Sequence, residues 1–124
     1  MRRVSASFKD GNQLVNVDLS VFIWNEDQTF FAYSPAFDIT GYGNSEDEAR
    51  KSFEVVLEEF LKYTHNKDTI FEELEKLGWT VNKRKKRIKS PDLNELLVDN
   101  EHFKHIYSSK APKQESKNIE LAFA

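Results

Sequence analysis

A run of alternating aliphatic residues limits most strongly what this chain can fold into. The run consists of Val15, Val17, Leu19, Val21 and Ile23. In an extended chain these side chains share one side, while Asn16, Asp18 and Ser20 point to the other, where Phe22 and Trp24 continue the series. The pattern predicts a strand with one buried face. Its second face should be polar at one end and covered by another element at its aromatic end.

Further strands are predicted around this one before any helix begins. They cover residues 4–8, 30–33 and 37–40. Asp10-Gly11 is typical of a two-residue hairpin turn, and residues 25–29 form the loop of a second hairpin. Pro35 cannot donate a hydrogen bond to a neighbouring strand, so the strand before it should end or bulge there. We therefore expect three or four antiparallel strands.

A capped helix is predicted directly after these strands. Ser45 and Glu48 have the spacing of a capping box, in which each side chain bonds the backbone N–H of the other. Gly41 and Gly43 should allow a sharp turn between strand and helix. A phosphate-binding loop would need more glycines and a Lys-Ser/Thr pair, which this segment lacks. The expected buried stripe recurs every three or four positions: Ala49, Phe53, Val56, Leu57, Phe60, Leu61 and Thr64.

A second, shorter helix is predicted just after the first. Thr69 and Glu72 have capping-box spacing at its start. Gly78 stands one position past its expected end, and Trp79 should pack back on Leu74. The following residues then read as the start of a strand that runs into a basic segment.

The last third of the chain is predicted to hold short helices, a linker and a strand. Ser90 and Pro91 suit the N-cap and first position of one helix, and residues 103–107 form another helical turn. Residues 108–118 are polar and linker-like. Residues 119–123 alternate and should pair with a sheet edge, in the same subunit or in another.

Length and composition limit the class of protein. The chain has 124 residues and no cysteine, so it has no disulfide framework and no thiolate metal site. It has neither an apolar run of membrane-spanning length nor a secretory signal, and we expect a cytoplasmic protein. We predict an α+β domain over residues 1–89 and a C-terminal extension over residues 90–124 that packs on the domain or on a partner subunit. A homodimer is expected, because the edge strands of a small sheet invite pairing.

A net charge of −3 conceals strong segregation of charge. One segment holds six of the eighteen basic residues, which leaves twelve basic residues against twenty-one acidic ones elsewhere. Its basic members are Lys83, Arg84, Lys85, Lys86, Arg87 and Lys89. The segment is either a solvated charged loop or a site of nonspecific contact with nucleic acid, with Trp79 stacking on a base.

Candidate catalytic and metal-binding residues are sparse. His102 and His105 are three apart on an expected helix, but no third ligand of the usual kind is evident. His65 suits the C-terminal end of the long helix as a dipole partner. Asp18 and Asp38 lie on expected strands, and a magnesium-dependent nuclease would need further acids to converge with them. We therefore expect no enzyme activity, no metal and no cofactor.

The segment NEDQTFFAYSPAFDITGYGNSEDEA, followed by the long helix, resembles the HicB family of antitoxins over about residues 15–65. The residues that carry the resemblance are Tyr33, Pro35, Phe37, Gly41, Gly43, Asn44, Ser45, Glu48 and Ala49. The stretch from Trp79 through SPDLNELLVDNEHFKHIY is also similar to the tail of HicB-like proteins of some bacteria. Thr40 and Tyr42 stand where that family usually has Pro and Cys, and residues 91–124 match neither of its DNA-binding domains.

The resemblance implies a degenerate ribonuclease-H-like fold, with a small antiparallel sheet of three to four strands covered by one long helix and no catalytic acids. It also implies an antitoxin that binds and masks a small basic HicA-like toxin, which cleaves mRNA. An acidic surface on the long helix suits such a partner. Its residues are Glu46, Asp47, Glu54, Glu58 and Glu59.

Overall fold

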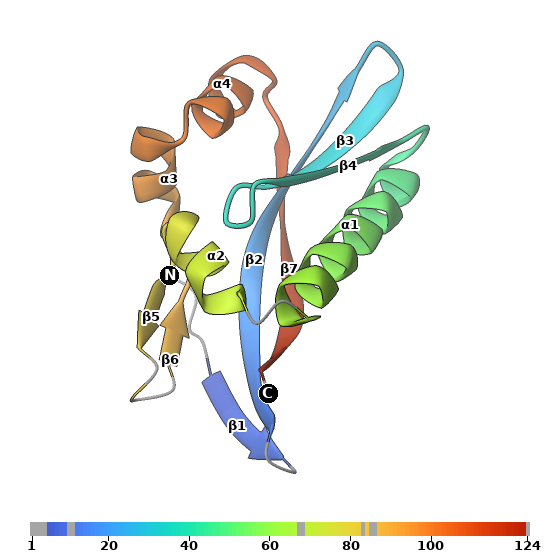
Figure 1. The fold of residues 1–124 in the computed structure, drawn as a ribbon. Helices are drawn as coiled ribbons and strands as arrows, with labels where there is room; N and C mark the ends of the chain where they lie inside the picture. Colours follow the sequence, from blue (N-terminus) through green and yellow to red (C-terminus); the bar gives the residue numbers. More distant parts are fainter. Residues whose placement is uncertain (1–4, 10–11, 67–68, 83, 85–86, 124) are drawn as a thin grey trace.

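The computed structural model of the protein describes residues 5–9, 12–66, 69–82, 84 and 87–123. Five strands form one antiparallel sheet: β1 (Ser5–Lys9), β2 (Asn12–Glu26), β3 (Thr29–Ser34), β4 (Ile39–Gly43) and β7 (Lys113–Phe123) (Figure 1). The helices are α1 (Glu46–Asn66), α2 (Ile70–Lys76), α3 (Leu93–Asp99) and α4 (Glu101–Ser109). A separate hairpin consists of β5 (Thr80–Asn82) and β6 (Arg87–Lys89). The expected α+β class is confirmed, and no described helix has the length and apolar character needed to cross a membrane.

The alternating segment forms a strand, as predicted, and this strand is the centre of the sheet. On one edge β2 pairs with β7 over eleven residue pairs, from Gln13–Phe123 to Ile23–Lys113. On the other edge it pairs first with β1 and then, beyond residue 21, with β3. The expected loop over residues 25–29 is shorter than predicted. Only Asp27 and Gln28 form the turn, both with the left-handed φ values typical of a two-residue hairpin, 52° and 69°.

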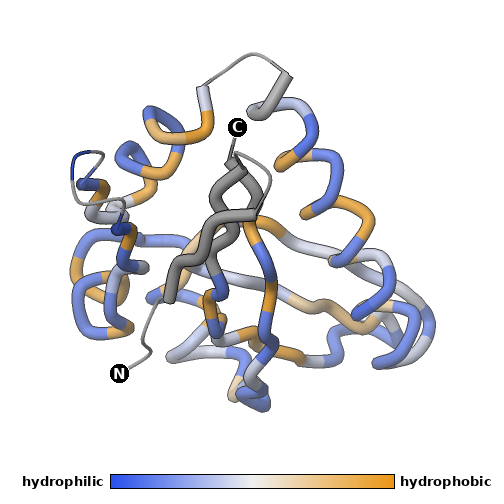
Figure 2. Tube along the Cα trace, turned by 90° about the horizontal axis from the view of Figure 1, so that it is seen from below, coloured by the Kyte–Doolittle hydropathy of each residue, from blue (hydrophilic) through white to orange (hydrophobic). Residues whose placement is uncertain are grey.

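The helix α1 packs its apolar stripe against one face of the sheet. Ala49, Phe53 and Leu57 are buried in a core that also contains the aliphatic side of β2. Apolar residues recur along the turns of α1 between polar ones (Figure 2). The inclusion of Val56 in the stripe was wrong, because its side chain is 39% exposed.

Gly41 and Gly43 allow close packing and do not form the predicted turn. Both lie within β4, and neither has a positive φ. A β-carbon on Gly41 would lie 2.1 Å from the backbone nitrogen of Phe53, and one on Gly43 would lie 2.5 Å from Cβ of Glu48. The two glycines therefore let β4 approach the backbone of α1 more closely than any side chain would permit.

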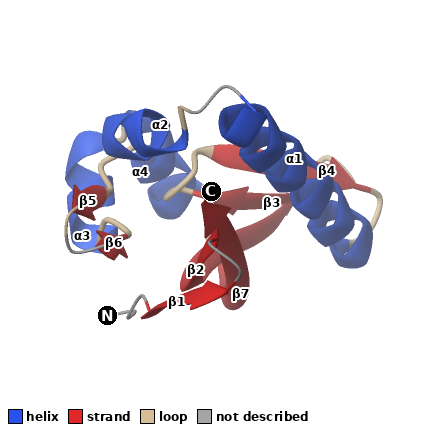
Figure 3. Ribbon diagram, turned by 60° about the horizontal axis from the view of Figure 1, so that its bottom comes forward, coloured by secondary structure: helices blue, strands red, loops and turns tan. Residues whose placement is uncertain are grey.

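The second face of the sheet is covered by α3 and α4, as the aromatic end of β2 predicts. Phe22 and Tyr33 of the sheet are buried against Leu96, Phe103 and Ile106 of these helices. The rings of Phe22 and Phe103 lie 5.1 Å apart. Figure 3 shows α2, α3, α4 and the β5–β6 hairpin gathered on one side of the molecule and α1 on the other.

Both ends of α2 lie where they were predicted, but the capping box at its start does not form. Gly78 has a φ of 95°, and the Trp79 N–H donates to the Leu74 carbonyl at 2.9 Å, which closes the helix. Thr69 occupies the N-cap without a side-chain hydrogen bond, so the capping box with Glu72 is absent.

The linker predicted over residues 108–118 was also wrong. The helix α4 continues to Ser109, and β7 begins at Lys113 and belongs to the same sheet as β2. The helix α3 begins later than Ser90-Pro91 indicated, with Asp92 at its N-cap. The extension over residues 90–124 thus contributes both the cover of one sheet face and a strand of the sheet itself.

Candidate partner-binding surface

The start of α1 is capped in a way that differs from the predicted box. The Glu48 N–H donates to the Ser45 hydroxyl at 3.1 Å, which is the first half of the motif. The Glu48 carboxylate instead accepts from the Asn44 N–H at 2.9 Å, one residue earlier than expected. These bonds fix the first turn of α1, where Glu46 and Asp47 also suit the helix dipole.

The flank of α1 that faces β7 is held by ion pairs within the chain. Arg50 donates from Nε and Nη2 to the two carboxylate oxygens of Glu115, at 2.9 and 2.6 Å. Arg50 also bonds Glu46 at 2.9 Å and Asp47 at 2.7 Å, one turn earlier on the same helix. It therefore links the first turn of α1 to β7 through three carboxylates.

Two lysines of β7 complete this network. Nζ of Lys113 lies 2.7 Å from Glu46 and 3.4 Å from Glu115, and Lys117 pairs with Glu54. We call the whole set the β7-side flank. It consists of the carboxylates Glu46, Asp47, Glu54 and Glu115 and the cations Arg50, Lys113 and Lys117. With four carboxylates and three cations, charge is nearly balanced within this flank.

These contacts change the protonation equilibria of the groups that make them. The hydrogen bond from Arg50 holds the pKa of Glu115 below its ordinary value of 4.5, and the bond from Lys113 does the same for Glu46. The bonds to Glu115 and to Glu46 in turn raise the pKa of Arg50 and the pKa of Lys113. Each group is thus stabilised in its charged form by a partner from the other element.

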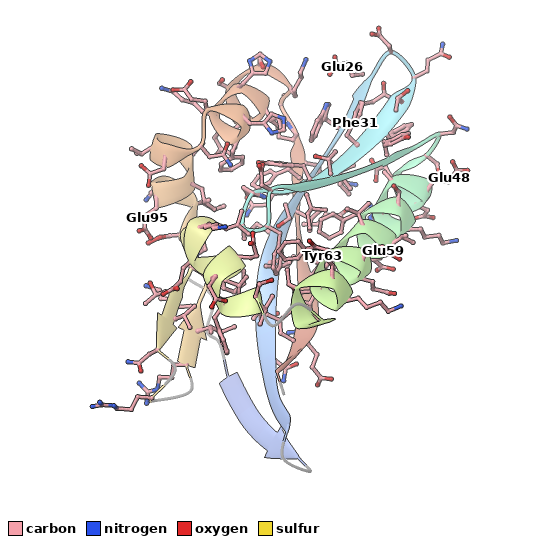
Figure 4. All side chains as sticks on the ribbon, viewed as in Figure 1. Glu26, Phe31, Glu48, Glu59, Tyr63 and Glu95 are labelled. Atoms are coloured by element: carbon pink, nitrogen blue, oxygen red, sulfur yellow. The ribbon has the colours of Figure 1, made fainter. Side chains whose placement is uncertain are left out.

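On the opposite flank of α1, toward β4, the described side chains form no such network. We call this flank the β4-side flank. It consists of Ser52, Val55, Val56, Glu59 and Tyr63, each of which lies three or four positions from another member. The Tyr42 N–H of β4 donates to the Ser52 hydroxyl at 3.1 Å and holds this flank against the sheet edge. Val55 and Tyr63 are 59% and 62% exposed, and Figure 4 labels Glu59 and Tyr63 along α1.

The five acids expected to bind a partner therefore fall into two groups. Glu46, Asp47 and Glu54 are engaged in ion pairs within the chain. Glu58 and Glu59 are exposed, and no cation whose side chain the structure describes lies within ion-pair distance of either one. The unpaired negative charge of this acidic set is thus concentrated at Glu58 and Glu59.

The basic segment lies at the β5–β6 hairpin. Arg84, Arg87 and Lys89 are exposed there, and the remaining members lie outside the described residues: Lys83, Lys85 and Lys86. The prediction that Trp79 stacks on a base is wrong, because this side chain is only 3% exposed. Its Nε1–H donates to the Ala36 carbonyl at 2.7 Å, which fixes the indole in the core.

The strand acids considered for metal binding do not form a site. Asp38 lies in the turn between β3 and β4 with a φ of 55°, and not on a strand as predicted. Asp18 accepts from Nδ2 of Asn118 at 2.8 Å and lines a cavity of about 460 Å³, whereas Asp38 lines another of about 520 Å³. Within the described part of the chain, no three His, Cys, Asp or Glu side chains are placed to hold a metal ion.

A polar cluster at the second cavity was not found by sequence reasoning. The Tyr33 hydroxyl donates to Asp38 at 2.6 Å and accepts from Asn100 at 3.2 Å, and Nδ1 of His102 lies 3.6 Å from Asp38. Burial, followed by the bond to Asp38, raises the pKa of Tyr33. His102 therefore faces this cluster, and not a metal shared with His105. The members come from distant parts of the chain, and no local motif signals them.

Comparisons with known proteins leave these surfaces as the basis for a functional conclusion. No protein-family model, no curated protein and no solved structure matches the chain. A function is therefore inferred from the geometry and charge of α1 and of the β5–β6 hairpin.

Proposed function

We propose that this chain is a HicB-like, antitoxin-type interaction module that binds and masks a small basic, HicA-like toxin that cleaves mRNA. The proposal is carried by the outward acidic side of α1, where Glu58 and Glu59 have no ion partner among the described residues while the apolar stripe is buried. The resemblance of residues 15–65 to that family supports the choice of partner. On this proposal the sheet and α1 form a degenerate ribonuclease-H-like fold.

Charge explains how such a module can mask a toxin. A protein that cleaves RNA must hold a polyanion, and it does so largely with Lys and Arg side chains that contact phosphates. An acidic helix offers carboxylates to the same cations. It therefore competes with RNA for one surface, and complementary charge also speeds the encounter of the two proteins.

The proposal is tested by co-expressing this chain with a small basic HicA-like protein encoded in an adjacent gene, and the absence of such a gene would contradict it. We expect one complex on size-exclusion chromatography at low salt. We also expect relief of the growth arrest that the basic protein causes when it is expressed alone. Separate elution of the two proteins, with no relief of growth arrest, would contradict the proposal.

The exposed cations of the β5–β6 hairpin favour a second candidate function, a nucleic-acid-binding accessory or regulatory protein without catalytic activity. Arg84 and Arg87 carry fixed charge at the end of a short hairpin, a shape that reaches a phosphate backbone. Filter binding of labelled RNA and DNA at two salt concentrations tests it. Loss of binding in Arg84→Ala/Arg87→Ala would support this function, and unchanged binding would exclude these residues.

A homodimer is also part of the proposal. Among the described strands, β4 pairs only with β3 and β7 pairs only with β2, so each leaves one edge without a strand partner. Light scattering at several protein concentrations tests it, and a monomer mass throughout would contradict it.

A further inference from the structure

We infer that the partner binds the β4-side flank of α1, and that it does so with an arginine-bearing basic surface centred on Glu59. This assignment deepens the proposed function and depends on it. It separates two groups of acids that look equivalent in the sequence, and it makes Glu59 and Tyr63 the central contacts.

The β7-side flank is a poor site for a cationic partner, because its charge is already neutralised. To use Glu46 or Glu54, a partner would have to replace Lys113 or Lys117, which already bond those carboxylates. Replacing one cation by another gains little, and it would loosen the link between α1 and β7. The flank retains a net charge of only about −1 to attract a cationic partner.

The β4-side flank offers a carboxylate that has no ion pair among the described side chains and that is surrounded by exposed apolar residues. Glu59 lies one turn from Val55, Val56 and Tyr63, all of them exposed. A partner that covers these side chains removes water from around Glu59, and the attraction between opposite charges strengthens as water is excluded. The same contact also buries apolar surface, so charge and burial favour binding together.

The neighbouring aromatic ring selects arginine over lysine. Tyr63 follows Glu59 by four residues, so the ring and the carboxylate lie side by side on the helix. A guanidinium can bond a carboxylate through two N–H groups and stack its flat face on an aromatic ring, whereas an ammonium group cannot make the paired contact. Tyrosine and arginine are also the side chains that most often dominate binding energy at protein interfaces.

Two lysines set the outer limit of this surface. Lys51 and Lys62 are exposed and lie with Glu58 along the outermost line of the helix, which borders the β4-side flank at Val55. Lys62 follows Glu58 by four residues and Glu59 by three, so it lowers the attraction of a cation to both acids. Glu59 differs from Glu58 in being one turn from both Val56 and Tyr63. Glu58 is therefore a matched control: it is adjacent, chemically identical and exposed, but on the wrong line of the helix.

The flank is also fixed before binding. The bond from the Tyr42 N–H to Ser52 ties this side of α1 to β4, and the close contact at Gly41 holds the helix backbone on the strand. A surface that is already ordered loses less conformational entropy when a partner binds.

The test measures Kd between purified chain variants and one probe, the small basic HicA-like protein used in the co-expression test, by calorimetry at low salt. We expect Glu59→Gln and Tyr63→Ala each to weaken binding about tenfold or more. Tyr63→Phe should retain most of the affinity, because the ring face is kept. Glu58→Gln and Glu54→Gln should each change Kd by less than about threefold, and thermal unfolding should show that every variant is folded.

Each outcome separates the inference from the function on which it rests. If the wild-type chain forms no complex with the probe, the proposed function fails and the inference fails with it. If the complex forms but Glu59→Gln and Tyr63→Ala bind as the wild type does, the inference fails and the proposed function stands. Stronger weakening by Glu54→Gln or Glu58→Gln than by Glu59→Gln would place the partner elsewhere on α1.

Discussion

The two flanks of α1 carry similar residues and use them in different ways. On the β7-side flank, acids meet Arg50, Lys113 and Lys117 and join the helix to the far strand of the sheet. On the β4-side flank, Glu59 lies among exposed apolar side chains and forms no ion pair with a cation whose side chain the structure describes. Charge that is balanced within the chain serves the architecture, whereas charge left without a partner remains for another molecule. The acidic character of a helix therefore says little about binding until its internal partners are known.

The largest effect should come from separating α1 from β4, because the arrangement of both flanks depends on that contact. In Gly41→Ala the new methyl group would lie 2.1 Å from the Phe53 nitrogen, so helix and strand must move apart. We expect a loss of about 3 kcal/mol or more in the free energy of unfolding, measured by urea denaturation. Gly78→Ala is the control: it has space for the methyl group but a φ of 95°, and it should cost only about 1 kcal/mol. Equal losses in both variants would mean that close packing at Gly41 is not what places the helix.

Much of the fold could be predicted because two periods in the sequence are strong. Alternation over β2 and the three- to four-residue stripe over α1 each identify a buried face from local sequence alone. Residues 113–118 failed the same test, because their side chains are polar on both sides of the strand. Glu115 and Lys117 of β7 bond residues of α1 that are more than sixty positions away in sequence, and local patterns contain no information about such contacts.

Removing the central ion pair of the β7-side flank should have the next largest effect. Glu115→Gln replaces the carboxylate that accepts two bonds from Arg50. We expect a loss of about 1 kcal/mol in the free energy of unfolding, because the pair is only partly buried and belongs to a network. A double-mutant cycle with Arg50→Gln should give a favourable coupling energy of similar size. Additive losses would show that the pair does not stabilise the fold.

The same flank should make stability fall in acid. The pKa values of Glu46 and Glu115 are lower in the folded chain than their ordinary value of 4.5, so below that pH the unfolded chain takes up more protons than the folded chain. Their contribution is complete above pH 4.5 and is lost as the pH falls through the folded-state pKa values. Melting temperatures measured from pH 7 down to pH 3 should show this decline, and Glu115→Gln should flatten it. If the melting temperature of Glu115→Gln declined with pH as steeply as that of the wild type, other groups would be responsible for the acid sensitivity.

The candidate site could be predicted only in part. The wrong assignment of a linker led to the wrong expectation that all five acids of α1 are available to a partner. The five acids of α1 are evident from the sequence, but assigning residues 108–118 to a linker concealed Lys113 and Lys117 as their partners. Three acids that looked available are in fact engaged. The distinction between Glu54 and Glu59 became visible only when β7 was placed beside α1.

The smallest effect on stability is expected where the effect on binding is largest. Glu59 makes no ion pair with any cation of the described side chains, so Glu59→Gln should change the free energy of unfolding by less than about 0.5 kcal/mol. Urea denaturation of Glu59→Gln beside Glu115→Gln gives the comparison in one experiment. A loss at position 59 as large as that at position 115 would mean that the β4-side flank also serves the architecture. If Glu59→Gln leaves the stability of the fold unchanged, then the fold does not require a charge at position 59. Binding of a cationic partner would then account for the carboxylate at this position.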